Sequence, residues 1–367
     1  MPILDQITIR GFRSIAAIER LPLQRVNVVI GANGAGKSNF IGIFTFLHRI
    51  ERKRLEEYVV RAGGAERVLH YGSKRTAAIE IELSFDDAQN QYQIELAPTD
   101  DDRLAPVSET VLFWDKSRYP APYNELISGR GNEAGIADQK FGTGRYVRDR
   151  LRSWRVYHFE DTSASSPMRK TATVGDDGIL REDASNLAAF LYRLQEQHSD
   201  RYGLIRRTLQ LVAPFFDDFN LQPSGEEDRF IKLEWRHRED ESYFDAASFS
   251  DGTLRFIALA VLLLQPPSLR PSVILIDEPE IGLHPYAITM LASLIKQASV
   301  ETQVIVSTQS AELLDHFEPE DILVAERVDG GTQLRRLDPE PLKEWLETYS
   351  LGELWQKNEI GGRPGGR

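Results

Sequence analysis

Three short runs of apolar residues carry no charge, and each is predicted to form a buried β-strand. They are VNVVI at 26–30, VILI at 273–276 and VIV at 304–306. Runs of this length, rich in β-branched residues, are typical of strands that are covered on both faces. Glycine-rich or polar residues follow each run, so we expect candidate functional residues at the ends of these strands.

Other segments alternate apolar and polar residues. AAIEIELSF at 77–85 and QYQIELAP at 91–98 predict a half-exposed antiparallel sheet, and 109–115 is a third β segment. Within 5–31, one more strand is expected at 5–15 (DQITIRGFRSI) besides the run at 26–30, and another is expected in RFIKLEW at 229–235. This pattern predicts an antiparallel β lobe beside the buried strands.

Helical spacing of apolar residues predicts helices over 38–57 and 186–212, and an apolar helix after Gly252. Residues 116–143 are rich in Gly, Pro and Asn and are expected to form a long irregular insertion. We therefore predict an α/β protein with a helical insertion lobe, and we divide the chain into 1–115, 116–225 and 226–367.

Composition narrows the possible functions. The chain has 367 residues, a net charge of −12 and no cysteine, so disulfides and thiolate metal sites are excluded. No run is long and apolar enough for a membrane helix, and the N-terminus lacks a signal-peptide pattern, so we expect a cytoplasmic protein. The acidic balance argues against broad coating of nucleic acid and leaves only a local basic patch for any DNA contact.

The first buried run leads into IGANGAGKSNF, a G-x-x-x-x-G-K-S pattern between a predicted strand and a predicted helix. Its glycines permit a tight turn whose backbone N–H groups can converge on phosphate oxygens. Lys37 adds charge for the β- and γ-phosphates, and Ser38 offers a hydroxyl to Mg²⁺. A chance glycine-rich turn is the alternative, but the strand–loop–helix setting favours a site for ATP with Mg²⁺.

The second run ends in Asp277 and Glu278. An aspartate at the tip of a buried strand is the expected partner of the Mg²⁺ ion, and the following glutamate can orient or deprotonate the attacking water. The two acids could instead cap the next helix, but the phosphate loop would then have no acidic partner for its metal.

Ser250, Asp251 and Gly252 directly precede the apolar helix, whose first N–H groups form a second anion-binding helix end. The chain already has one phosphate loop, so this second end needs another phosphate. The simplest arrangement is a head-to-tail homodimer in which Ser250 and Gly252 of each chain cover the γ-phosphate that the other holds. An ordinary serine N-cap without a ligand is the alternative.

Together these segments resemble the motif set of ABC-type ATPases. The versions DEPEIGLHP, STQSAELLD and ITIRGFRSI, with WRVYHFEDTS and LGELWQKNEIGGRP, resemble the RecF/SMC/OLD side of that class, and in particular the stand-alone prokaryotic ATPases of the AAA-21 kind. The resemblance covers nearly the whole chain. It implies an ATPase head with a mixed central sheet, an antiparallel β lobe and a helical lobe.

The resemblance also implies residue roles. The nucleotide would be bound by the phosphate loop, by Arg13 of GFRS and by the signature residues Ser250 and Gly252. Gly282–Pro285 would sense the partner chain, and Gln309 would occupy the switch position, where histidine is usual. Because glutamine carries no charge, slow turnover is expected. The phosphate-loop residues are Asn33, Gly34, Ala35, Gly36, Lys37, Ser38 and Asn39.

The resemblance also requires a glutamine-containing loop, for which no clear match exists. HFED at 158–161 is the substitute, although His158 could equally be a structural histidine.

The predicted function is an ATP-gated homodimeric switch that acts on a separately encoded effector, a nuclease or a toxin, in anti-phage defence or DNA repair. A RecF-like DNA clamp and a scaffold with purely structural ATP are the alternatives. The basic segment 145–155 bears on the choice among these functions. Its arginines could contact a nucleic-acid backbone or an acidic protein partner, or they could form a solvent-exposed helix face. They are Arg145, Arg148, Arg150, Arg152 and Arg155.

Overall fold

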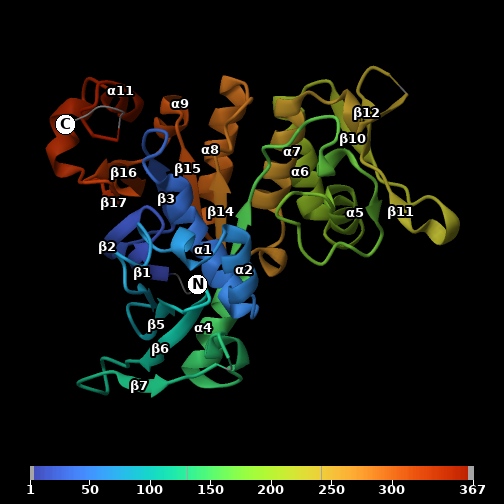
Figure 1. The fold of residues 1–367 in the computed structure, drawn as a ribbon. Coiled ribbons are helices and arrows are strands. Elements are labelled where there is room, and N and C mark those ends of the chain that lie inside the picture. Colours follow the sequence, from blue (N-terminus) through green and yellow to red (C-terminus); the bar gives the residue numbers. More distant parts are fainter. Residues whose placement is uncertain (1–3, 130, 241, 363–367) are drawn as a thin grey trace.

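The computed structural model describes residues 4–129, 131–240 and 242–362, and it contains two six-stranded sheets (Figure 1). The first is wholly antiparallel and has the strand order β2-β1-β4-β5-β6-β7. Its strands are β1 (Leu4–Phe12), β2 (Ile15–Pro22), β4 (Ile79–Phe85), β5 (Asn90–Pro98), β6 (Leu104–Phe113) and β7 (Tyr123–Leu126). This sheet is the predicted antiparallel β lobe.

The second, central sheet has the order β17-β16-β3-β15-β14-β8 and is parallel except for its edge strand β17. Its strands are β3 (Val26–Ile30), β8 (Arg155–Tyr157), β14 (Val273–Asp277), β15 (Gln303–Thr308), β16 (Ile322–Val328) and β17 (Gly331–Arg336). The three uncharged runs occupy the middle of this mixed sheet, which confirms that they form buried strands.

Alternate residues of these central strands enter two different cores. Val29, Leu275 and Ile305 join the core that contains the antiparallel sheet and α1 (Lys37–Glu51). Their neighbours Val28 and Ile276 face the other core, together with α7 (Asp251–Leu264) and α8 (Pro285–Ser299). Because both faces are covered, these runs carry no charged residue.

A helical lobe lies beside the central sheet, at the right of Figure 1. Its helices α5 (Leu187–Gln197) and α6 (Ser199–Val212) pack on each other, and α6 packs on α7. Small sheets complete this lobe. They are formed by β10 (Phe216–Asn220) with β12 (Glu234–His237) and β13 (Tyr243–Asp245), and by β9 (Ala172–Thr173) with β11 (Phe230–Ile231).

The remaining helices are short. They are α2 (Leu55–Ala62), α3 (Ala65–Val68), α4 (Gly142–Ser153), α9 (Ala311–Leu314), α10 (Lys343–Leu346) and α11 (Leu351–Gln356). Among the described residues, every helix is too short or too polar to span a membrane.

Several predicted elements differ from the observed ones. The helix expected over 38–57 stops at Glu51, because Lys53 has a φ of 55° and breaks it before α2. The segment 5–31 holds three strands rather than two, and 229–235 holds β11 and β12 rather than one strand. The insertion 116–143 contains β7, which extends the antiparallel sheet, so that sheet continues past residue 115. The domain boundaries at 115 and 225 stay predictions.

Candidate nucleotide site and its acidic partners

The glycine-rich loop joins β3 to α1 at the carboxyl end of the central sheet. Gly36 caps α1 with a φ of 104°, and no side chain bonds to the first N–H groups of the helix. A β-carbon on Gly36 would collide with Thr332 of β17, so only glycine fits there. The positive end of α1 is therefore free to receive an anion.

Lys37 is almost completely buried, with 5% of its surface exposed. Its ammonium donates to the carbonyls of Gly31 and Ala32 at 2.7 and 3.3 Å. Burial lowers the pKa of Lys37, and the nearby carboxylates of Glu278 and Asp277 oppose that shift. The charge of Lys37 is thus held between the loop and the acidic strand end.

Ser14 and Thr332 brace the loop, and the sequence analysis missed both. Their hydroxyls lie 2.7 Å apart, Asn39 donates to Ser14 at 2.6 Å, and Thr332 donates to the Ala35 carbonyl at 2.9 Å. Ser14 stands beside Arg13 in the GFRS segment, which was noticed only for its arginine. The Asn39 side chain therefore supports the phosphate loop through its hydrogen bond to Ser14. Asn33, Gly34 and Ser38 of the same loop are exposed.

Arg13 lies on a turn with a φ of 49°. Its guanidinium stacks over Phe12 and over Tyr58 of α2, at 5.5 and 5.7 Å from the ring centres. It also lines a hollow with Thr45 of α1. The role of Arg13 as a nucleotide contact stays a prediction.

Asp277 and Glu278 end β14 next to the end of β15. Ser307 donates a hydrogen bond to Asp277, and Gln309 donates one to Glu278. Glu278, the residue after β14, has a φ of 44°, a backbone conformation that non-glycine residues seldom adopt. The structure therefore brings together the two acids and the switch glutamine that the sequence predicted separately.

Glu280 is a further acidic residue that the prediction did not single out. It is 8% exposed and accepts hydrogen bonds from the Thr308 hydroxyl at 2.5 Å and from the Gln309 amide at 3.3 Å. Within the described residues its second oxygen has no partner, and burial raises its pKa. Glu280 thus holds the backbone that carries Gln309.

The signature end of α7 is exposed and capped by its own residues. Ser250 accepts from the Thr253 amide at 3.2 Å, and the two hydroxyls lie 2.8 Å apart. Gly252 lies against the Gly282 backbone so closely that a side chain would collide with it. The predicted signature and the predicted partner-sensing loop therefore touch within one chain.

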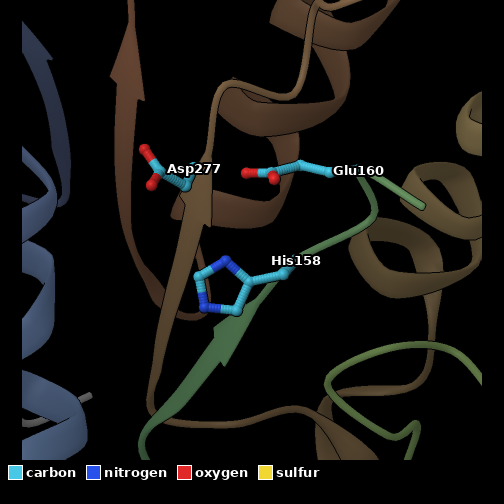
Figure 2. A group of neighbouring side chains, drawn as sticks. All are labelled: His158, Glu160 and Asp277. Carbon is cyan, nitrogen blue, oxygen red and sulfur yellow. The ribbon is translucent and has the colours of Figure 1, made fainter. Parts of the chain in front are cut away.

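HFED follows β8, the edge strand beside β14. The ligand atoms of His158, Glu160 and Asp277 lie within 4.8 Å of one another (Figure 2). In Figure 2 the Glu160 carboxylate points toward Asp277, and the imidazole of His158 lies beside them. The segment expected to replace a glutamine loop therefore lies at the predicted metal-binding aspartate.

A family model matches residues 26–315, and its description is "AAA domain, putative AbiEii toxin, Type IV TA system". The chain belongs to this AAA_21 family. No curated protein matches it.

Solved structures show the same fold as this AAA_21 chain. An SmcHead bound to the C-winged helix domain of ScpA has 16% identity and a TM-score of 0.58, with 92% of this chain and 99% of that chain covered. The Smc head of Pyrococcus furiosus, bound to the C-terminal domain of ScpA, has 17% identity and a TM-score of 0.57, with 95% and 99% covered. The prediction of an SMC/RecF-like ABC-type ATPase fold is confirmed.

The basic segment of this AAA_21 chain forms α4 and the start of β8, and its arginines bind mainly within the chain. Arg145 and Arg148 pair with Asp149, and Arg152 pairs with the buried Glu51 at 2.7 Å. Arg150 stacks on a tyrosine ring, and Arg155 donates to the backbone carbonyls of Arg152 and Trp154. Asp149 and Glu51 therefore offset part of the positive charge of this segment, whereas the ring and carbonyl contacts of Arg150 and Arg155 leave their charge in place.

Proposed function

We propose that the protein is a homodimeric ATPase switch that binds and hydrolyses ATP with Mg²⁺ and controls a separately encoded effector. The observation that carries this proposal is the contrast between two helix ends. The α1 end has a buried lysine and no side-chain cap, whereas the α7 end is capped by the hydroxyl of Ser250, and its Asp251 is paired with Arg169 at 3.0 Å. The α1 end supplies a lysine and the α7 end supplies a serine hydroxyl. A head-to-tail dimer would bring these two ends, from different chains, to one ATP.

In this proposal the phosphate loop holds the triphosphate, while Ser38 and Asp277 hold Mg²⁺. These donors suit a hard cation, since a hydroxyl and a carboxylate are oxygen ligands. Glu278 orients the attacking water, and its bond with Gln309 ties it to the switch strand. Gly282–Pro285 lies against Gly252, so a partner that moves one segment also moves the other.

Membership of a family described by a putative toxin of a toxin–antitoxin system supports an effector partner and a defence role. The similar Smc heads are bound to ScpA domains, which supports a partner-binding head. We therefore place the protein in the cytoplasm, in anti-phage defence or DNA repair. The intramolecular pairing of Arg145, Arg148 and Arg152 favours this switch over a DNA clamp.

The test is Glu278→Gln. The variant should bind ATP, form a long-lived dimer and lose turnover by about 10²–10⁴-fold, the usual range for a general base. Phosphate release and mass photometry with ATP, with ADP and without nucleotide measure these outcomes. Exposed Glu312→Gln is the matched control and should behave like the parent.

Hydrolysis by the Glu278→Gln variant at the parental rate would show that another group activates the water. ATP-dependent binding of duplex DNA by the purified protein, weakened steeply by salt, would favour the clamp instead.

A further inference from the structure

The position of His158 follows from the register of two neighbouring strands. β8 and β14 run parallel, and Tyr157 lies opposite Ile276. The next residues along the two strands are His158 and Asp277, so the register itself brings these side chains to one sheet edge. Glu160 follows two residues later and reaches the same place (Figure 2).

The backbone that carries these ligands is fixed on both sides. The His158 amide donates to the Glu182 carbonyl at 3.0 Å. Arg255 of α7, which is 5% exposed, donates to the carbonyls of Phe159 and Glu160 at 2.8 and 2.9 Å. The Glu182 carbonyl therefore holds the backbone at His158, and the buried Arg255 holds it at Phe159 and Glu160, before any ligand arrives.

The donor atoms remain accessible. The His158 and Glu160 side chains are exposed, and Asp277 is half-buried. Ser307 bonds one oxygen of Asp277, which leaves the other oxygen for a ligand. Metal–ligand bonds near 2.1 Å need donor atoms about 3–4 Å apart, so small side-chain rotations from the present spacing suffice.

The donor set is not one that Mg²⁺ selects. Mg²⁺ prefers oxygen ligands and keeps several waters, whereas imidazole suits zinc, nickel and iron. We propose that His158, Glu160 and Asp277 form a binding site for a divalent first-row transition metal, which they bind more tightly than Mg²⁺. This inference rests on the proposed function in that the same Asp277 oxygen would serve Mg²⁺ once ATP is bound, so the transition-metal site belongs to the nucleotide-free chain.

Calorimetry on the nucleotide-free full chain, with Zn²⁺, Mn²⁺ or Mg²⁺ each added alone, tests the site. We expect about one Zn²⁺ per chain, bound more tightly than Mn²⁺ and far more tightly than Mg²⁺, as the general affinity order of these ions requires. His158→Ala should weaken Zn²⁺ at least about tenfold and leave Mg²⁺ nearly unchanged. Glu160→Gln should weaken all three ions.

His158→Gln sharpens the test, because it keeps a donor but exchanges nitrogen for oxygen. It should lose the preference for Zn²⁺ while still binding Mg²⁺. His198→Gln, at the junction of α5 and α6, is the matched control and should bind Zn²⁺ like the parent. Circular dichroism checks that each variant is folded. Equal affinity of the parent for Zn²⁺ and Mg²⁺, or Zn²⁺ binding unchanged by His158→Ala, would overturn the proposal.

The Lys37→Ala background separates this inference from the proposed function. Zn²⁺ alone should still bind to that variant, because Lys37 is no part of the metal site. Zn²⁺ binding without any ATP-dependent dimer would remove only the switch proposal. A normal ATP dimer in a protein that ignores Zn²⁺ would remove only the metal site.

Discussion

The N-terminus of α1 and the N-terminus of α7 both present backbone N–H groups, but the chain builds them differently. At α1 the cap is a glycine in a left-handed conformation, without a side-chain bond, and the first helical residue is a buried lysine. At α7 the cap is a serine that bonds to Thr253, and the first turn contains Asp251, which pairs with Arg169 at 3.0 Å.

The difference shows that the two ends do not have the same task. An uncapped end with a buried ammonium is costly unless an anion binds there, so α1 is arranged for a phosphate. At a serine-capped end the serine bonds one of the free N–H groups, and the remaining N–H groups can add hydrogen bonds to a phosphate that another group holds. This asymmetry is the basis of our proposal that the phosphate loop of one chain and the signature of another share one ATP.

The largest effect should come from removing Lys37, the cation at the N-terminus of α1. Lys37→Ala should abolish nucleotide binding, because the loop would keep its N–H groups but lose the buried ammonium proposed to bind the β- and γ-phosphates. A fluorescent ATP analogue measures this loss. Lys53→Ala, which removes an exposed lysine paired with Asp138, should bind ATP normally. Micromolar binding by Lys37→Ala would contradict the account of α1.

A smaller effect is expected at the switch. Gln309→Ala should lower turnover by about 10–10²-fold with little change in ATP affinity, because Gln309 donates a hydrogen bond to Glu278 and so positions the proposed catalytic base. Steady-state phosphate release gives kcat and KM separately. The exposed Gln297→Ala, on α8, serves as control. If KM rises and kcat does not fall, Gln309 contributes to binding rather than to the chemical step.

The smallest effect should be on stability at Glu280. Glu280→Ala should lower the free energy of unfolding by about 1–3 kcal/mol, because it removes the acceptor of Thr308 and Gln309. Glu280→Gln should lose less. Urea unfolding at several pH values measures both.

The pH dependence has a defined sign. Burial raises the pKa of Glu280 in the folded chain above 4.5, so the folded state binds more protons than the unfolded state. The contribution to stability is therefore present at low pH and is lost as pH rises through the folded pKa. The Gln variant should lack this decline. If the free energy of unfolding changes with pH equally in the parent and in Glu280→Gln, Glu280 does not govern the pH dependence.

The sequence could predict the sites that depend on short segments. The phosphate loop, the two acids and the serine before α7 are each contiguous, and their strand and helix settings follow from local apolar patterns. The three central strands were equally clear, because burial on both faces removes charge from them.

Residues that act through distant contacts were missed. Thr332 braces the loop from β17, and Arg255 holds the HFED backbone from α7. Nothing local marks either residue. The break in the helix after Glu51 was also hidden, since RKR is compatible with a helix and only the positive φ of Lys53 ends it.

Subunit mixing tests most directly whether the signature of one chain serves the phosphate loop of another. Lys37→Ala lacks a working loop and Ser250→Arg lacks a working signature, so each variant alone should not hydrolyse ATP. In an equal mixture, half of the dimers should contain both variants and keep one intact composite site, which restores about a quarter of the parental rate. Activity of Ser250→Arg by itself, or no recovery on mixing, would contradict the account.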